Sequence, residues 1–180
     1  MFGVNHLIPG QLISILTFPG VILHEAAHVF ICKLLGVVVF EVKFFRIGNP
    51  SGYVIHEAPR KFSHQILICF APFLLNSILG SWIGASAGIP LFHPFSGSAI
   101  DYFLLWLGFS IALHCLPSTT DAQSLWKRLW QIETGILEKF IGFPIAIFAF
   151  AGSYGGYLLL DGVYALAIIF ILPKLLARLF

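Results

Sequence analysis

Apolar runs long enough to cross a lipid bilayer occupy most of this chain. They cover about residues 8–35, 63–88 and 100–117, and a last run over about 138–178 is long enough for two spans. A helix needs about 20 apolar residues to cross a hydrocarbon core of about 30 Å. Because lipid offers the backbone no hydrogen-bond partners, such runs fold as helices. The sequence therefore predicts an all-α polytopic membrane protein with about five transmembrane helices, and four is the alternative.

The composition agrees with this class of protein. Hydrophobic residues make up 58% of the chain and charged residues only 10%, against about 25% charged in soluble domains. With 180 residues there is little room for a soluble domain. We expect one membrane-embedded domain over residues 1–180, with a core at about 8–130 and an extra helical hairpin at about 136–180. We expect this domain to be embedded in, and in contact with, the lipid bilayer.

Three features exclude other classes. The net charge of +2, without a run of Lys or Arg, argues against nucleic acid as a partner. No Lys or Arg precedes the first apolar run, so we expect the N-terminal residues to be mature sequence and not a secretory signal. Cys32, Cys69 and Cys115 stand far apart inside apolar runs, which predicts buried small side chains and no disulfide or metal site.

The basic residues predict the topology. All ten Lys and Arg lie at or between the ends of the first and second predicted spans, between the third and fourth, or at the end of the fifth. Five spans with the N-terminus outside place every one on the cytoplasmic side, together with the C-terminus. Four spans would put Lys174 and Arg178 on the opposite side from the rest. We therefore expect an integral multi-pass protein of a prokaryotic plasma membrane, with a plastid membrane as the alternative.

The segment after the first predicted span has a strand pattern. Within residues 37–59, Phe40, Val42 and Phe44 alternate with charged residues, and a Gly-Asn-Pro-Ser-Gly turn follows. This pattern predicts a β-hairpin at the membrane surface between the first two spans. The alternative is a short apolar connection without regular structure.

The segment after the third predicted span has a helical pattern. Residues 119–133 place apolar side chains at helical spacing beside basic residues and tryptophans, namely Leu125, Leu129, Ile132, Trp126, Trp130, Lys127 and Arg128. Tryptophan and basic side chains are typical of the boundary between lipid and water. We expect an amphipathic helix there.

A metal-binding motif stands inside the first predicted span. His24, Glu25 and His28 form His-Glu-Ala-Ala-His. The i and i+4 spacing places both imidazoles on one helix face, close enough to bind one zinc ion, and Glu25 can take a proton from a water molecule at that ion. Ionisable groups at this depth are costly and tend to be functional. The alternative is a histidine pair hydrogen-bonded to neighbouring helices without metal.

The third zinc ligand should come from another helix at the same depth. His28 lies five residues before Lys33, and therefore about 7 to 14 Å below the cytoplasmic edge at about 1.5 Å per residue. Asp121 follows the third span on that side, after Pro117, which ends the helix. Asp121 also fits an N-terminal cap of the amphipathic helix. His114, His56 and His64 lie near enough to be considered as ligands, and each suits a structural or interfacial role better.

With these residues the chain resembles the site-2 protease family of intramembrane zinc metalloproteases. It is similar to a divergent, minimal member of that family. The resemblance covers about residues 10–130. It rests on "HEAAH", on the Asp in "LPSTTDA", where the family has Asn-Pro-Asp-Gly, and on "APFLLN" (Ala71 to Asn76). In the last, Ala71 stands where the family has Gly, and Asn76 is one residue further from Pro72.

The resemblance implies a three-helix catalytic core holding one zinc ion by His24, His28 and Asp121, with Glu25 as general base and acid. It implies an endopeptidase that cleaves transmembrane segments of protein substrates near the cytoplasmic face. The hairpin matches a family β element to which an unwound substrate adds as a strand. Asn76 becomes a candidate for binding the substrate backbone or the developing oxyanion.

Two other functions remain open from the sequence. One is a non-proteolytic assembly factor or complex subunit that keeps the metal for structure, with a membrane-protein partner or a second copy of itself. The other is a transporter that uses His24, Glu25 and Asp121 as an ion path. A transporter predicts charges spread along a path, whereas these cluster at one depth.

Overall fold

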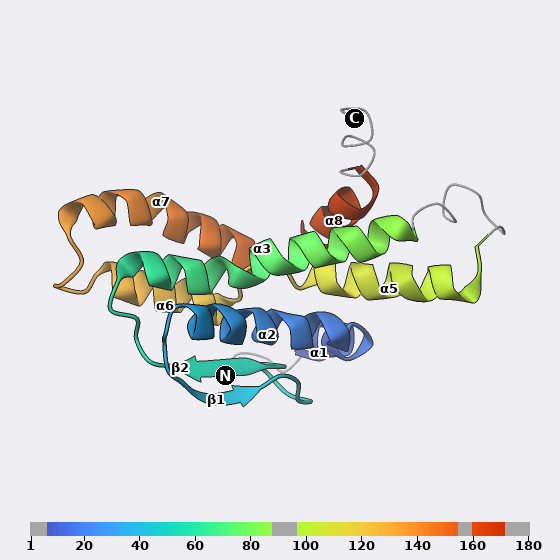
Figure 1. Ribbon diagram of the computed structural model, residues 1–180, viewed down its shortest axis with the longest axis horizontal. Coiled ribbons are helices and arrows are strands. Elements are labelled where there is room, and N and C mark those ends of the chain that lie inside the picture. The colour runs from blue at the N-terminus through green and yellow to red at the C-terminus, as the bar shows by residue number, and fades with distance from the viewer. Residues whose placement is uncertain (1–6, 88–96, 155–159, 172–180) are drawn as a thin grey trace.

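The computed structural model describes residues 7–87, 97–154 and 160–171, and these are mostly helical with one two-stranded sheet (Figure 1). The elements, in chain order, are α1 (Leu7–Leu16), α2 (Phe18–Leu34), β1 (Val39–Lys43), β2 (Tyr53–His56), α3 (Phe62–Ser86), α5 (Ala99–Leu113), α6 (Thr119–Leu129), α7 (Ile136–Ser153) and α8 (Leu160–Leu166), which continues as the π-helical turn Ala167–Ile171.

Among the described residues, α3 and α7 are each long and apolar enough to cross a membrane. A third candidate is the pair α1 and α2, which passes the same test only when the two are counted together. The apolar helices α5 and α8 are shorter. The structure thus supports two to three spans of the five expected. The loop at 88–98, the turn at 152–156 and the chain after residue 171 lie wholly or partly outside the described residues.

The first apolar run is not one straight helix, contrary to the expectation of a single span over residues 8–35. Helices α1 and α2 meet at Thr17 with a bend of 88°. Pro19 lies in the first turn of α2 and has no N–H to donate to a carbonyl of α1. The last hydrogen bonds at the end of α1 come from Thr17, whose N–H and hydroxyl both donate to the Ile13 carbonyl, at 2.9 and 2.6 Å. The helical ladder therefore stops at this point and a new helix begins.

Helices α2, α3 and α5 form a core in which small residues let the backbones approach closely. A Cβ on Gly108 of α5 would overlap the backbone of Gly84 of α3, and one on Gly20 of α2 would overlap the Ser110 carbonyl of α5. Close backbone approach through small residues is the usual packing of helices in membranes. These contacts fix α2, which carries the histidine motif, against the two helices beside it.

The predicted β-hairpin is confirmed, and it lies alongside α2 (Figure 1). Strands β1 and β2 are antiparallel, with Val42 opposite Val54 and a register irregularity between Val39 and Glu41. The ring of Phe45, after β1, lies 6.0 Å from that of Phe18 at the start of α2. The hairpin therefore runs back along the helix and is not confined to the end where α2 stops.

Helix α6 is the predicted amphipathic helix, although its apolar side packs on protein. Leu125 and Leu129 are fully buried against a cluster from α3 and α7. The Arg128 guanidinium donates to the Thr134 hydroxyl at 2.9 Å and to the Arg60 carbonyl at 3.0 Å, which joins the end of α6 to the start of α3. Ile132 lies beyond the helix and is exposed.

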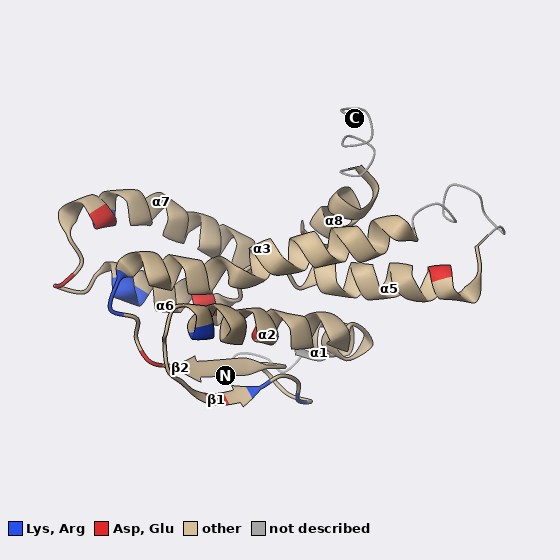
Figure 2. Ribbon diagram, viewed as in Figure 1, with Lys and Arg blue, Asp and Glu red and all other residues tan. Residues whose placement is uncertain are grey.

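Charged residues gather at helix ends and on the hairpin, while α3, α5 and α7 are free of charge over most of their length (Figure 2). The described Lys and Arg flank the end of α2, the starts of α3 and α7, and the end of α6, or lie on the hairpin and its turn. Lys174 and Arg178 lie outside the described residues. The three cysteines are free and buried, as predicted.

Candidate metal centre

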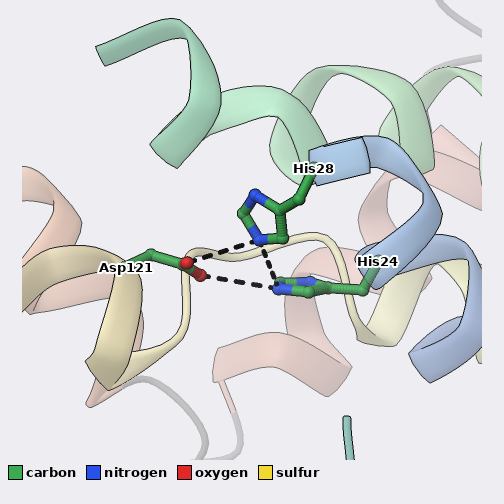
Figure 3. A group of neighbouring side chains, drawn as sticks. All are labelled: His24, His28 and Asp121. Atoms are coloured by element: carbon green, nitrogen blue, oxygen red, sulfur yellow. Dashed lines mark hydrogen bonds and ion pairs between the residues drawn. The ribbon is translucent and has the colours of Figure 1, made fainter. Parts of the chain in front are cut away.

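Three predicted ligands converge in the structure (Figure 3). His24 and His28 lie one turn apart on α2, and Asp121 lies in the first turn of α6. His24 Nε2 is 3.5 Å from Asp121 Oδ2, His28 Nε2 is 3.3 Å from Asp121 Oδ1, and the two Nε2 atoms are 3.2 Å apart. One donor atom from each residue lies within 4.8 Å of the others, which suits a single metal ion.

Asp121 is also a helix cap, so the cap considered from the sequence and a position suited to a metal ligand occur in the same residue. Its Oδ2 accepts hydrogen bonds from the Ser118 backbone N–H at 2.8 Å and from the Ser118 hydroxyl at 2.7 Å. The Ser118 hydroxyl in turn accepts from the Asp121 N–H, completing a capping box. The cap holds the carboxylate at the start of α6 with Oδ1 directed at His28.

The histidine rings are oriented by backbone carbonyls. His24 Nδ1 lies 2.9 Å from the His114 carbonyl, and His28 Nδ1 lies 2.9 Å from the Ile68 carbonyl. Because a carbonyl only accepts, each Nδ1 carries a hydrogen, and each Nε2 of a neutral ring presents its lone pair. Metal-binding histidines commonly donate their other ring N–H in this way.

The donor set fits a divalent metal. Two imidazole lone pairs and a carboxylate face one another across less than 4.8 Å, and such electron-rich groups repel unless a cation lies between them. A proton on one Nε2 relieves part of this repulsion, and a metal ion relieves all of it. Two histidines and one carboxylate also match a catalytic zinc site, in which the fourth position is left for water.

Glu25 lies beside the three ligands and lines the same cavity, of about 390 Å³. Only 8% of its surface is exposed. The hairpin covers it, since a Cβ on Gly52 would lie 2.7 Å from Glu25 Cγ. No lysine or arginine of the described chain lines this cavity. Its other walls come from the hairpin turn, the segment between α5 and α6, and residues Gly152, Ser153 and Asp161.

The remaining candidates are not part of the metal-ligand group. Asn76 is fully buried, outside the residues that line the cavity, and its amide donates to the His114 carbonyl at 3.1 Å. The ring of His114 lies 2.7 Å from the Thr17 hydroxyl, so His114 contributes to the site through its carbonyl. His56 lines the cavity, and its Nδ1 forms a hydrogen bond with the Glu57 carbonyl oxygen. His64 is not part of the metal-ligand group.

Some residues of the site were missed by the sequence analysis. Ser118 was visible as the first residue of a Ser-x-x-Asp capping pattern. The Ile68 and His114 carbonyls and the contact of Gly52 with Glu25 have no side-chain signature, because a backbone group is the same in every residue. The chain matches no protein-family model, and neither the curated proteins nor the solved structures gave a significant match.

Proposed function

We propose that the protein is a zinc-dependent intramembrane endopeptidase that hydrolyses peptide bonds in transmembrane segments near the cytoplasmic face. The observation that carries the proposal is the convergence of His24, His28 and Asp121 in a cavity that Glu25 also lines. A zinc ion held by these three residues would supply Lewis-acid activation of water and of the scissile carbonyl.

Glu25 performs the proton transfers. Its carboxylate takes a proton from the attacking water as the water oxygen bonds to the carbonyl carbon. The same proton passes to the amide nitrogen as the carbon–nitrogen bond breaks, and Glu25 returns to its ionised form. A positioned general base of this kind contributes about 100- to 10,000-fold to the rate.

The membrane arrangement belongs to the same proposal. Helices α3 and α7, the bent pair α1 and α2, and the shorter α5 and α8 would form five spans of a prokaryotic plasma membrane, with a cytoplasmic C-terminus. The metal ligands then lie near the cytoplasmic ends of α2 and α5. A two-stranded sheet leaves the outer edge of each strand without a strand partner in the described chain. An unwound substrate segment would pair with such an edge.

The test is Glu25→Gln, assayed by co-expression with a single-span substrate and, after purification, for zinc content. We expect cleavage to fall at least about 100-fold while zinc stays at one ion per chain, because glutamine cannot take the proton. Glu133→Gln, which changes an exposed carboxylate after α6, is the matched control and should cleave as the wild type does. Cleavage that persists in Glu25→Gln would exclude this mechanism.

A structural metal site is the second candidate, favoured by the cover that the hairpin places on Glu25. The protein would then act as an assembly factor or subunit that keeps the metal for stability. Stoichiometric zinc without turnover, together with a membrane protein that co-purifies at a fixed ratio, would support this function over proteolysis.

A further inference from the structure

Three helices meet at one backbone oxygen next to the metal centre. The His114 carbonyl, at the end of α5, accepts from His24 Nδ1 of α2 at 2.9 Å and from Asn76 Nδ2 of α3 at 3.1 Å. His114 is the C-cap of α5, and the last carbonyls of a helix have no partner within the helix. The position of this oxygen therefore depends on the side chains that bind it.

Asn76 faces the carbonyl and not the cavity. Its side chain is fully buried and absent from the residues that line the cavity, and its Oδ1 has no hydrogen-bond partner within the described chain. Turning the amide over would set Oδ1 against the His114 oxygen, so the carbonyl fixes which atom donates. A buried acceptor without a partner costs about 1 to 3 kcal/mol. The amide is thus poorly suited to stabilising the fold.

We infer that Asn76 is a positioning residue, which holds the His114 carbonyl so that His24 keeps its Nε2 directed at the metal. This inference rests on the metal site of the proposed function. It differs from the substrate-binding role expected for Asn76 from the sequence. Asn76 acts two hydrogen bonds away from the metal, through the carbonyl and the imidazole.

The position of Asn76 predicts separate effects on stability and metal affinity. Leucine has the same number and branching of heavy side-chain atoms as asparagine and no polar atoms, so Asn76→Leu removes both the donor and the unpartnered acceptor. A residue that serves only the fold would lose stability when replaced. A positioning residue would instead lose zinc affinity, because the carbonyl that orients His24 is released. Loss of an outer partner of a metal-bound histidine typically weakens affinity about 10- to 100-fold.

Ser77→Ala provides the matched control. Ser77 is the next residue of α3, and its hydroxyl lies 2.9 Å from that of Tyr164, so the variant also removes a part-buried side-chain hydrogen bond between α3 and α8. Ser77 does not contact the metal ligands through any hydrogen bond of the described chain. Its replacement should leave zinc affinity unchanged.

The experiment measures zinc affinity by chelator competition, the visible absorption of the cobalt-loaded protein, and thermal unfolding, for the wild type and for the Asn76→Leu, Asn76→Ala and Ser77→Ala variants. We expect both Asn76 variants to fold, to bind zinc about 10- to 100-fold more weakly and to show a shifted cobalt spectrum. Unchanged affinity and spectrum in Asn76→Leu would overturn the inference, as would failure of both Asn76 variants to fold. A wild type that binds no zinc would instead overturn the proposed function.

Discussion

Ser118 and Asp121 hold each other in a reciprocal cap, and the same carboxylate faces the two histidines. Oδ2 of Asp121 binds the N–H and hydroxyl of Ser118, while Oδ1 lies 3.3 Å from His28 Nε2. The start of α5 has a second capping box, in which Asp101 Oδ2 accepts from the N–H and hydroxyl of Ser98 at the same distances, and no histidine contacts it in the described chain. The chain thus contains its own control for separating the two roles of Asp121.

The first prediction uses this pair of caps. Asp121→Asn keeps one oxygen to accept from Ser118 but loses the carboxylate that faces the histidines. Zinc affinity should fall by more than the 10- to 100-fold typical of losing an outer partner. The two variants Asp121→Asn and Asp101→Asn should lower the unfolding temperature by similar amounts, because each weakens one helix cap. Asp101→Asn should leave zinc affinity unchanged. Competition with a chelator and thermal unfolding measure the two effects. Equal zinc affinity in both variants would remove Asp121 from the ligand set.

The second prediction concerns the glycine that covers the proposed base. A Cβ on Gly52 would lie 2.7 Å from Glu25 Cγ and 2.9 Å from its Oε1, so Gly52→Ala must move the carboxylate or the hairpin. Misplacing a catalytic group by about 1 Å costs on the order of 100-fold in rate. Cleavage should fall by about that factor while zinc stays bound. Gly10→Ala, in open space, is the control, and equal activity of both variants would contradict the prediction.

The third prediction tests the packing of α3 on α5. A Cβ on Gly108 would overlap the Gly84 backbone, which cannot move aside as a flexible side chain can. Gly108→Ala should therefore destabilise the fold by about 1 to 3 kcal/mol, the usual cost of overpacking. Gly162→Ala has nothing within 4 Å of the added carbon and should be neutral or slightly stabilising. Unfolding in detergent compares the stabilities of the two variants. Equal stabilities would contradict the prediction, because α3 and α5 would then make room for the added methyl group without destabilising the fold.

The sequence was most informative where periodicity and spacing carry the signal. The i and i+4 histidines, the hairpin over residues 37–59 and the small buried cysteines all appear as expected. Asp121 was predicted as a third ligand by its depth relative to His28, with a helix cap as its alternative role. These features depend on local geometry, which a sequence encodes directly.

Other features were missed either because hydropathy does not register the effect of a single proline or because they depend on contacts between distant segments. The bend at Thr17 follows from Pro19 within a run that is apolar on both sides, so hydropathy alone treated the run as one span. The hairpin lies along α2 because the rings of Phe45 and Phe18 meet. The contact of Asn76 with the His114 carbonyl joins residues 38 positions apart through a backbone atom. None of these contacts leaves a pattern in the neighbouring residues.

The bend at Thr17 has a consequence for the lipid around the site. It leaves α2 with 17 residues, and α5, which packs against it, has 15. At about 1.5 Å per residue these helices are about 25 and 22 Å long, shorter than a hydrocarbon core of about 30 Å. Lipid adapts to short helices by local thinning. In the proposed five-span arrangement the bilayer would therefore be thinnest beside the two helices that carry and orient the histidines, and this would shorten the path from bulk water to Glu25.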